Sequence, residues 1–111
     1  MDPQILSVIK EIANNAGNDF QHLTIKIECP LDGGIKVLCW KESKHGKEYL
    51  PITNGVKPFY LLVQKMKQEN HQKFNIVEIE ANKNFQCTTE TIWDEQLQKQ
   101  AEQLVQEGEM K

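Results

Sequence analysis

Three glutamates, Glu78, Glu80 and Glu90, come closest in this chain to an arrangement for acid–base chemistry. Glu78 and Glu80 are two residues apart on an expected strand, so they share one face of it, and Glu90 follows across a turn. A catalytic carboxyl pair needs one carboxyl in an apolar pocket that raises its pKa. These glutamates instead share a polar strand face with Gln86 and Thr88. We therefore expect no acid–base site here and predict that the protein is not an enzyme.

Thiol and imidazole groups are the other candidates for chemistry. The cysteines are Cys29, Cys39 and Cys87, and the histidines are His22, His45 and His71. Each cysteine falls at an apolar position of an expected strand, as small core residues do, and the odd number suits a reducing compartment. No histidine pair has the spacing of a metal site. We expect no nucleophile, no metal and no cofactor, and, because no signal peptide is visible, a cytoplasmic protein.

Charge is unevenly distributed along the chain, whose formal net charge is −3. Residues 1–71 carry nine lysines against eight acidic residues, whereas residues 72–111 carry four lysines against eight acidic residues. Arginine, the usual bidentate ligand of phosphate and guanine, is absent. We therefore expect a basic protein partner and no direct contact with nucleic acid. Lys41, Lys44 and Lys47 form either a solvated loop, which we favour, or a phosphate-binding patch.

The periodicity of apolar residues predicts a single α+β domain over residues 1–111, an antiparallel sheet of about five strands with three helices in the order α-β-β-β-α-β-β-α. Helices are expected over residues 3–16, 58–69 and 93–107, and strands around residues 23–29, 35–40, 49–53, 77–81 and 85–90. The third strand should lie at an edge because Pro51 lacks a backbone donor. No apolar run is long enough to cross a membrane.

The last hairpin is expected to have one apolar and one acidic face. With a three-residue turn at residues 82–84, the expected pairs are Ala81 with Phe85, Ile79 with Cys87 and Val77 with Thr89. The opposite face carries acidic residues, which continue into the last helix: Glu78, Glu80, Glu90, Asp94 and Glu95. This acidic surface is either a solvated face that keeps the hairpin from aggregating or a binding face for a basic partner. The sequence leaves both open.

The two tryptophans have different expected roles. Trp93 should anchor the last helix, whose expected buried stripe is Trp93, Leu97, Ala101, Leu104 and Val105, with Gly108 as its stop. Alternation places Trp40 on the strand face opposite Ile35, Val37 and Cys39. It is therefore either covered by a helix or exposed as an anchor for a partner.

The second half of the chain resembles small bacterial immunity proteins of contact-dependent or polymorphic toxin systems. The residues that carry the resemblance are an amphipathic helix from Phe59, then Phe74-Asn-Ile-Val-Glu-Ile-Glu, a short turn with Asn and Lys, Phe85-Gln-Cys-Thr-Thr-Glu, and Trp93-Asp94-Glu95. The resemblance is one of pattern over about half the chain, without a diagnostic motif. It implies a cytoplasmic inhibitor, a monomer or weak dimer, that covers the active site of a basic toxin domain, often a nuclease. The partner-binding residues would be Glu78, Glu80, Glu90, Asp94, Glu95 and Trp40.

The order of elements also resembles that of class I secretion chaperones, which are small acidic homodimers that hold an effector segment partly unfolded. This chain is short and weakly charged for that group. A small enzyme without a recognisable motif is the third alternative.

Overall fold

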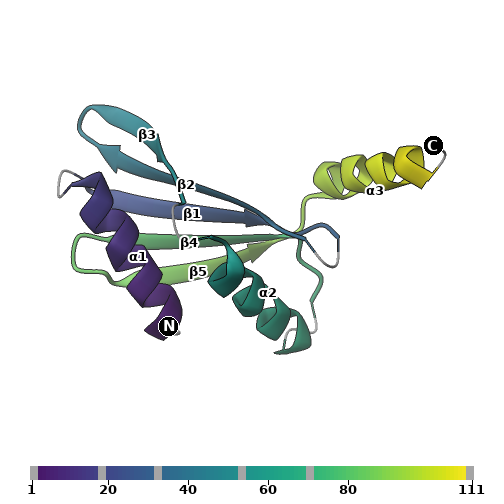
Figure 1. Cartoon of the computed structure of the whole chain (residues 1–111), viewed down its shortest axis with the longest axis horizontal. Helices are drawn as coiled ribbons and strands as arrows, with labels where there is room; N and C mark the ends of the chain where they lie inside the picture. The colour runs from purple at the N-terminus through teal and green to yellow at the C-terminus, as the bar shows by residue number, and fades with distance from the viewer. Residues whose placement is uncertain (1–2, 18–19, 32–33, 53–54, 70–71, 110–111) are drawn as a thin grey trace.

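A computed structural model describes residues 3–17, 20–31, 34–52, 55–69 and 72–109 (Figure 1). It contains three helices and a five-stranded antiparallel sheet of strand order β3-β2-β1-β4-β5, which confirms the predicted α+β class. In chain order the elements are α1 (Pro3–Ala16), β1 (His22–Glu28), β2 (Lys36–Ser43), β3 (Gly46–Leu50), α2 (Lys57–Glu69), β4 (Ile76–Asn82), β5 (Cys87–Ile92) and α3 (Glu95–Glu109). No described helix is long and apolar enough to cross a membrane.

The apolar core lies between one face of the sheet and the helices α1 and α2 (Figure 1). The sheet contributes alternate residues of β1 and β4, which lie opposite one another as Leu23 with Ala81, Ile25 with Ile79, and Ile27 with Val77. The helices contribute residues at helical spacing, namely Ile5, Ile9, Ile12 and Ala13 of α1 and Phe59 and Val63 of α2. The two patterns confirm that α1 and α2 are amphipathic helices. The strand order places β1 at the centre of the sheet, between β2 and β4.

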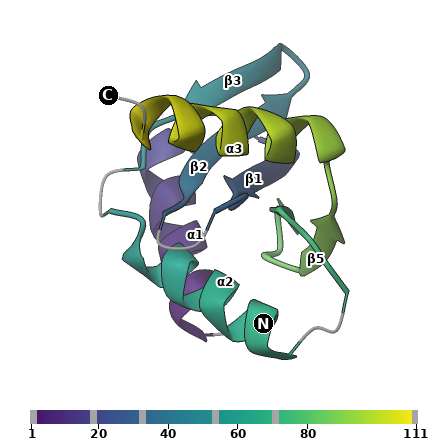
Figure 2. The ribbon, with the colours of Figure 1, turned by 90° about the vertical axis from the view of Figure 1, so that its right-hand side faces the viewer.

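The helix α3 extends past the end of the sheet instead of packing on it (Figures 1 and 2). The radius of gyration is 15.1 Å, whereas a compact domain of this length has about 13 Å. The predicted buried stripe of this helix is wrong, because Leu104 is 68% exposed and Val105 44% exposed, and Trp93 before the helix is 40% exposed. Leu97 and Ala101 are only half-buried. The helix also runs through Gly108, which was expected to end it.

The buried side chain of Asn75 joins β4 to the start of α3. It is 1% exposed. Its Oδ1 accepts from the Asp94 N–H at 2.8 Å, and its Nδ2 donates to the Asp94 carbonyl at 2.7 Å and to Gln98 Oε1 at 3.3 Å. The Asp94 carboxylate then accepts from the backbone N–H groups of Gln96 and Leu97, both at 3.0 Å, as a helix N-cap. One buried amide therefore fixes where the last helix begins.

The register of the last hairpin differs from the prediction by two residues. Ala81 lies opposite Cys87, and Ile79 lies opposite Thr89. The loop comprises residues 83–85 rather than 82–84, because the Asn82 N–H donates to the Gln86 carbonyl and the Asn82 side chain accepts from the Gln86 N–H at 3.0 Å. Since side chains alternate with period two, a shift of two keeps the residues of β4 and β5 on their predicted faces. Phe85 instead lies in the loop, with a φ of 58°.

The third strand begins earlier than predicted, at Gly46 instead of Tyr49, and it ends before Pro51. Gly46 has a φ of 109°, which lets the chain reverse directly after β2. The prediction that this strand lies at an edge of the sheet is confirmed.

Candidate protein-binding face

The sheet has an open face, the one opposite α1 and α2, and no helix in the described part of the chain lies across it (Figure 1). The register places residues of all five strands on this face. One cross-strand row runs Tyr49, Trp40, Thr24, Glu80 and Thr88. The next row runs Leu38, Lys26, Glu78 and Glu90. Four of the predicted partner-binding residues, the three glutamates and Trp40, therefore share one surface.

The acidic end of the open face is formed by β4 and β5. Glu78 lies directly between Lys26 on β1 and Glu90 on β5, and such cross-strand neighbours have Cβ atoms about 5 Å apart. Glu80, one row away, is exposed between Thr24 and Thr88. One lysine thus accompanies three carboxylates, so this end of the face carries net negative charge and would attract a basic surface.

The aromatic end of the open face is formed by β2 and β3. Trp40 and Tyr49 meet edge to face with ring centroids 5.8 Å apart. The Lys47 ammonium lies 4.0 Å from the Trp40 ring centroid and 5.1 Å from that of Tyr49. Trp40 is half-buried, whereas Tyr49 is 62% exposed. Between this pair and Glu80 lies the small side chain of Thr24, which is 2% exposed.

Tyr49 and Lys47 were not recognised as candidate site residues from the sequence. They share a strand face with each other, which alternation indicates, but their position beside Trp40 depends on the pairing of β2 with β3. That pairing is set by the tight turn at Gly46. The predicted later start of β3 obscured it.

Asp94 and Glu95 lie at the start of α3, beyond the end of β5, and the structure does not bring them onto the open face. The Asp94 carboxylate caps the helix, as described above. The Glu95 carboxylate accepts from Trp93 Nε1 at 3.0 Å. Both acidic side chains therefore have local partners at the start of the helix.

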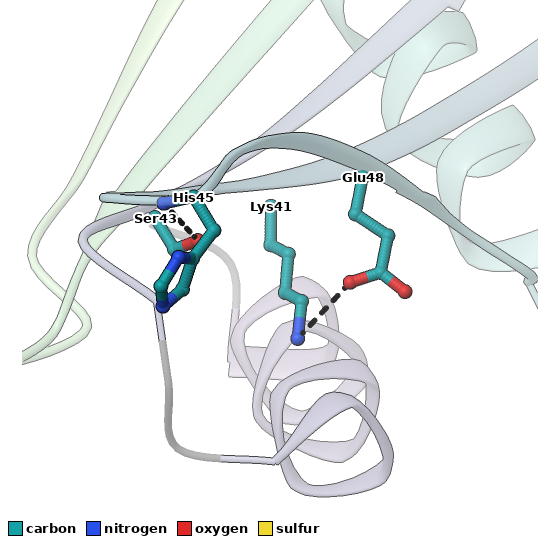
Figure 3. Close-up of polar contacts among 4 residues, drawn as sticks. All are labelled: Lys41, Ser43, His45 and Glu48. Carbon is teal, nitrogen blue, oxygen red and sulfur yellow. Dashed lines mark hydrogen bonds and ion pairs between the residues drawn. The ribbon is translucent and has the colours of Figure 1, made fainter.

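The lysines near the β2–β3 turn do not form one patch. Lys41 faces the helix side of the sheet and pairs with Glu48, which lies opposite it in the register, at 3.3 Å (Figure 3). Lys47 lies on the other face, over the aromatic rings. The turn itself is held by the His45 N–H, which donates to Ser43 Oγ at 3.2 Å (Figure 3). These placements favour ordinary strand side chains over a phosphate-binding patch.

The cysteines pack in or against the apolar core, as predicted: Cys29 and Cys39 are buried and Cys87 is half-buried. Burial raises the pKa of the Cys39 thiol to about 12. Burial also raises the pKa of the Cys29 and Cys87 thiols, and for Cys29 the nearby Lys67 ammonium partly opposes the rise. All three thiols therefore stay protonated near neutral pH, which disfavours a nucleophilic role.

We expect the thiols to differ in reactivity toward a thiol-specific reagent at pH 8. Half-buried Cys87 should react first, and Cys29 and Cys39 only as the protein unfolds. Labelling followed by mass spectrometry of peptides tests this order, and a Cys39 that reacts as fast as in unfolded protein would contradict it. In the unfolded chain the Cys39 thiol loses its proton above about pH 9.0, whereas in the folded chain it retains the proton until about pH 12. The stability contributed by Cys39 should therefore fall as the pH rises through this window.

Two surface hollows among the described residues contain no recognisable catalytic set. A hollow of about 360 Å³ is lined by Cys29, Lys67, Lys73, Phe74 and Trp93, among others. A second, of about 480 Å³, lies between α3 and the β1–β2 connection. Neither contains a histidine or a carboxyl pair. Within the described residues no three His, Cys, Asp or Glu side chains group as metal ligands would; His71 lies outside them.

Comparison with known proteins does not assign the chain to a group: no protein-family model matches it, and no curated protein matches it significantly.

Proposed function

We propose that this protein is a non-catalytic immunity protein that binds a delivered toxin domain and covers its active site. The observation that carries the proposal is the open sheet face, where half-buried Trp40 and exposed Tyr49 lie on β2 and β3 and three carboxylates lie on β4 and β5. Protein interfaces commonly combine an aromatic anchor with charge that is complementary to the partner, and this sheet face has both features. The toxin domain, for example a nuclease, would present a basic active-site surface to the open face. Binding would take place in the cytoplasm.

The two ends of the open face would contribute differently to binding. Trp40 and Tyr49 offer large, rigid apolar area, which dominates affinity when it is desolvated at the centre of an interface. The carboxylates of Glu78, Glu80 and Glu90 would steer a basic partner and raise the association rate more than the affinity. Occlusion of the active site then requires no chemistry by the inhibitor.

The proposal is tested by capturing partners from the source lysate with tagged wild-type protein and with a Trp40→Ala/Tyr49→Ala variant. Mass spectrometry should identify, with wild type only, a basic toxin domain of a large secreted protein. The purified domain should lose its activity at a stoichiometric amount of wild-type protein. A Leu61→Ala variant, altered at an exposed apolar residue of α2, is the control and should behave as wild type.

Three results would count against the proposal. The first is equal capture of the toxin domain by the Trp40→Ala/Tyr49→Ala variant, which would place the interface elsewhere. The second is a captured domain whose activity persists in the complex. The third is loss of capture with Leu61→Ala, which would move the contact to the helices.

The second candidate function is a chaperone-like homodimer that holds a segment of a secreted effector. The observation that favours it is the exposed apolar stripe of α3, where Leu104 is 68% and Val105 44% exposed. Exposed apolar helix faces commonly mark protein interfaces. The short chain and its weak net charge count against this alternative.

Leu104→Glu separates the two candidates. Because Leu104 is 68% exposed, the free energy of unfolding of the monomer should change by less than about 0.5 kcal/mol. Light scattering with size exclusion should show that the wild-type protein is a monomer or a weak dimer, and that any dimer is lost in the variant. A tight wild-type dimer that Leu104→Glu dissociates would favour the chaperone-like candidate over the immunity protein.

A further inference from the structure

The strand β5 is an edge of the sheet, and no described strand lies beyond it. Its sequence, Cys87–Ile92, contains no proline, glycine or lysine. Natural edge strands commonly carry such residues, which prevent pairing with other chains. The opposite edge, β3, does so: it begins at Gly46, contains Lys47 and is followed by Pro51. Of the two edges, β5 is therefore the one better suited to accept another strand.

The hydrogen-bond pattern identifies the backbone groups of β5 that point outward. The Asn82 N–H donates to the Gln86 carbonyl at 3.1 Å, which makes these residues a hydrogen-bonded pair. Hydrogen-bonded and non-hydrogen-bonded pairs alternate along an antiparallel ladder. The backbone of Glu90 therefore bonds to β4. The N–H and C=O groups of Thr89 and Thr91 point away from β4, toward the position of an added strand.

A charge ladder ends at this edge. Lys26, Glu78 and Glu90 follow one another across β1, β4 and β5. The first two form an opposite-charge pair, whereas Glu78 and Glu90 are like charges directly opposite one another, which is unfavourable. On an added strand, the side chain next to Glu90 would extend the ladder. A lysine or arginine at that position would relieve the repulsion.

We propose that β5 binds an extended basic segment of a partner protein as a sixth strand, with a lysine or arginine beside Glu90. The outward groups of Thr89 and Thr91 would form the main-chain hydrogen bonds, and the charge ladder would select a basic sequence. The inference rests on the proposed function, because the segment would belong to the toxin domain that the open face binds. The inference adds a second mode of recognition, in which a strand of the partner pairs with β5 at the acidic end of the open face.

A second copy of this chain is a poorer occupant of the same edge. Antiparallel pairing of two β5 strands about their middle would place the two Glu90 side chains opposite or diagonal to one another. Like charges in such positions destabilise a sheet. The charge that favours a basic partner therefore disfavours self-association through β5.

The test is a titration of isotope-labelled protein with a short peptide of alternating lysine and threonine, followed by the backbone amide signals. We expect shifts concentrated on β5, with slower hydrogen exchange at Thr89 and Thr91. Thr89→Pro removes an outward N–H, together with an exposed threonine side chain, at a position where an edge strand tolerates proline, and should weaken binding about tenfold. Glu90→Lys should weaken it about fivefold or more. Glu11→Lys makes the same charge change on exposed α1 and should leave binding unchanged.

The same peptide, N-methylated at the residues that would bond to Thr89 and Thr91, checks the result without altering the protein and should not bind. The inference is overturned if the methylated peptide binds as well as the unmodified one, or if the wild-type protein shows no shifts on β5 at millimolar peptide. Self-association through β5 without peptide would also overturn it. Because the peptide experiment needs no toxin, its failure alone would leave the capture of a toxin domain by the open face standing.

Discussion

Asn75→Ala is expected to lower the free energy of unfolding by about 3 kcal/mol, because it removes the three hydrogen bonds by which this buried side chain holds the start of α3. Asn75 is 1% exposed, and its side chain forms three hydrogen bonds to Asp94 and Gln98. For a domain of this size the midpoint of thermal unfolding should fall by about 10 °C. Denaturation by urea and by heat, followed by circular dichroism, measures both quantities.

Gln98→Ala is the matched control, because of the three hydrogen bonds of Asn75 it removes the longest, at 3.3 Å, together with an exposed hydrogen bond from Gln98 to Glu102 at 3.1 Å. It should cost about 1 kcal/mol or less. We also expect Asn75→Ala to change the fluorescence of Trp93, which adjoins the start of α3, while α1, α2 and the sheet keep their structure. If the Asn75→Ala and Gln98→Ala variants have the same free energy of unfolding, then the buried amide of Asn75 does not hold α3 in place.

The order of elements could be predicted from the sequence because its signals are local. The stripe of Ile5, Ile9 and Ile12 and the alternation in β1 and β4 require no knowledge of distant residues. The faces of the last hairpin were also predicted correctly, although its register was not. The loop begins at Lys83 because the Asn82 side chain bonds backbone groups of the turn itself, and these bonds are not visible as a hydrophobic pattern.

The position of α3 could not be predicted, for a different physical reason. Periodicity shows that a helix has an apolar stripe, but it does not show which surface covers that stripe. Leu104 and Val105 fit a buried pattern, yet they lie on a helix that extends beyond the sheet. The role of Asn75 was missed because a single asparagine between two apolar residues gives no sign of three tertiary hydrogen bonds.

The candidate site was predictable in part. The carboxylates and Trp40 are on the same sheet face because β1 lies between β2 and β4, an order that no local pattern specifies. Asp94 and Glu95 were grouped with the acidic face by their proximity in sequence, whereas the chain leaves the sheet before it reaches them.

Reversing two charges with Glu78→Lys and Glu80→Lys is expected to slow association with the captured toxin domain by about tenfold to a hundredfold at low salt. The dissociation rate should change less, because steering acts mainly on the encounter. The difference from wild type should shrink as salt is added, since the Debye length falls. Stopped-flow or surface-binding kinetics over a range of salt concentrations measure these effects.

Glu11→Lys with Glu69→Lys, on exposed positions of α1 and α2, makes the same change of net charge away from the open face and should slow association far less. The Glu78→Lys change places a lysine beside Lys26, so a loss of stability of up to about 1 kcal/mol is expected and should be measured first. Equal slowing by the two pairs of substitutions would show that net charge, not this face, governs association.

Footprinting of aromatic side chains in the complex tests the central claim most directly. Hydroxyl radicals oxidise exposed tryptophan and tyrosine. The chain carries two internal references away from the open face: Trp93, which lines a hollow with Lys67 of α2, and Tyr60, which lies on α2. We predict that binding of the toxin domain protects Trp40 and Tyr49 and leaves Trp93 and Tyr60 unchanged. Protection of Trp93, with Trp40 and Tyr49 still oxidised as in the free protein, would contradict the account and place the interface at α3.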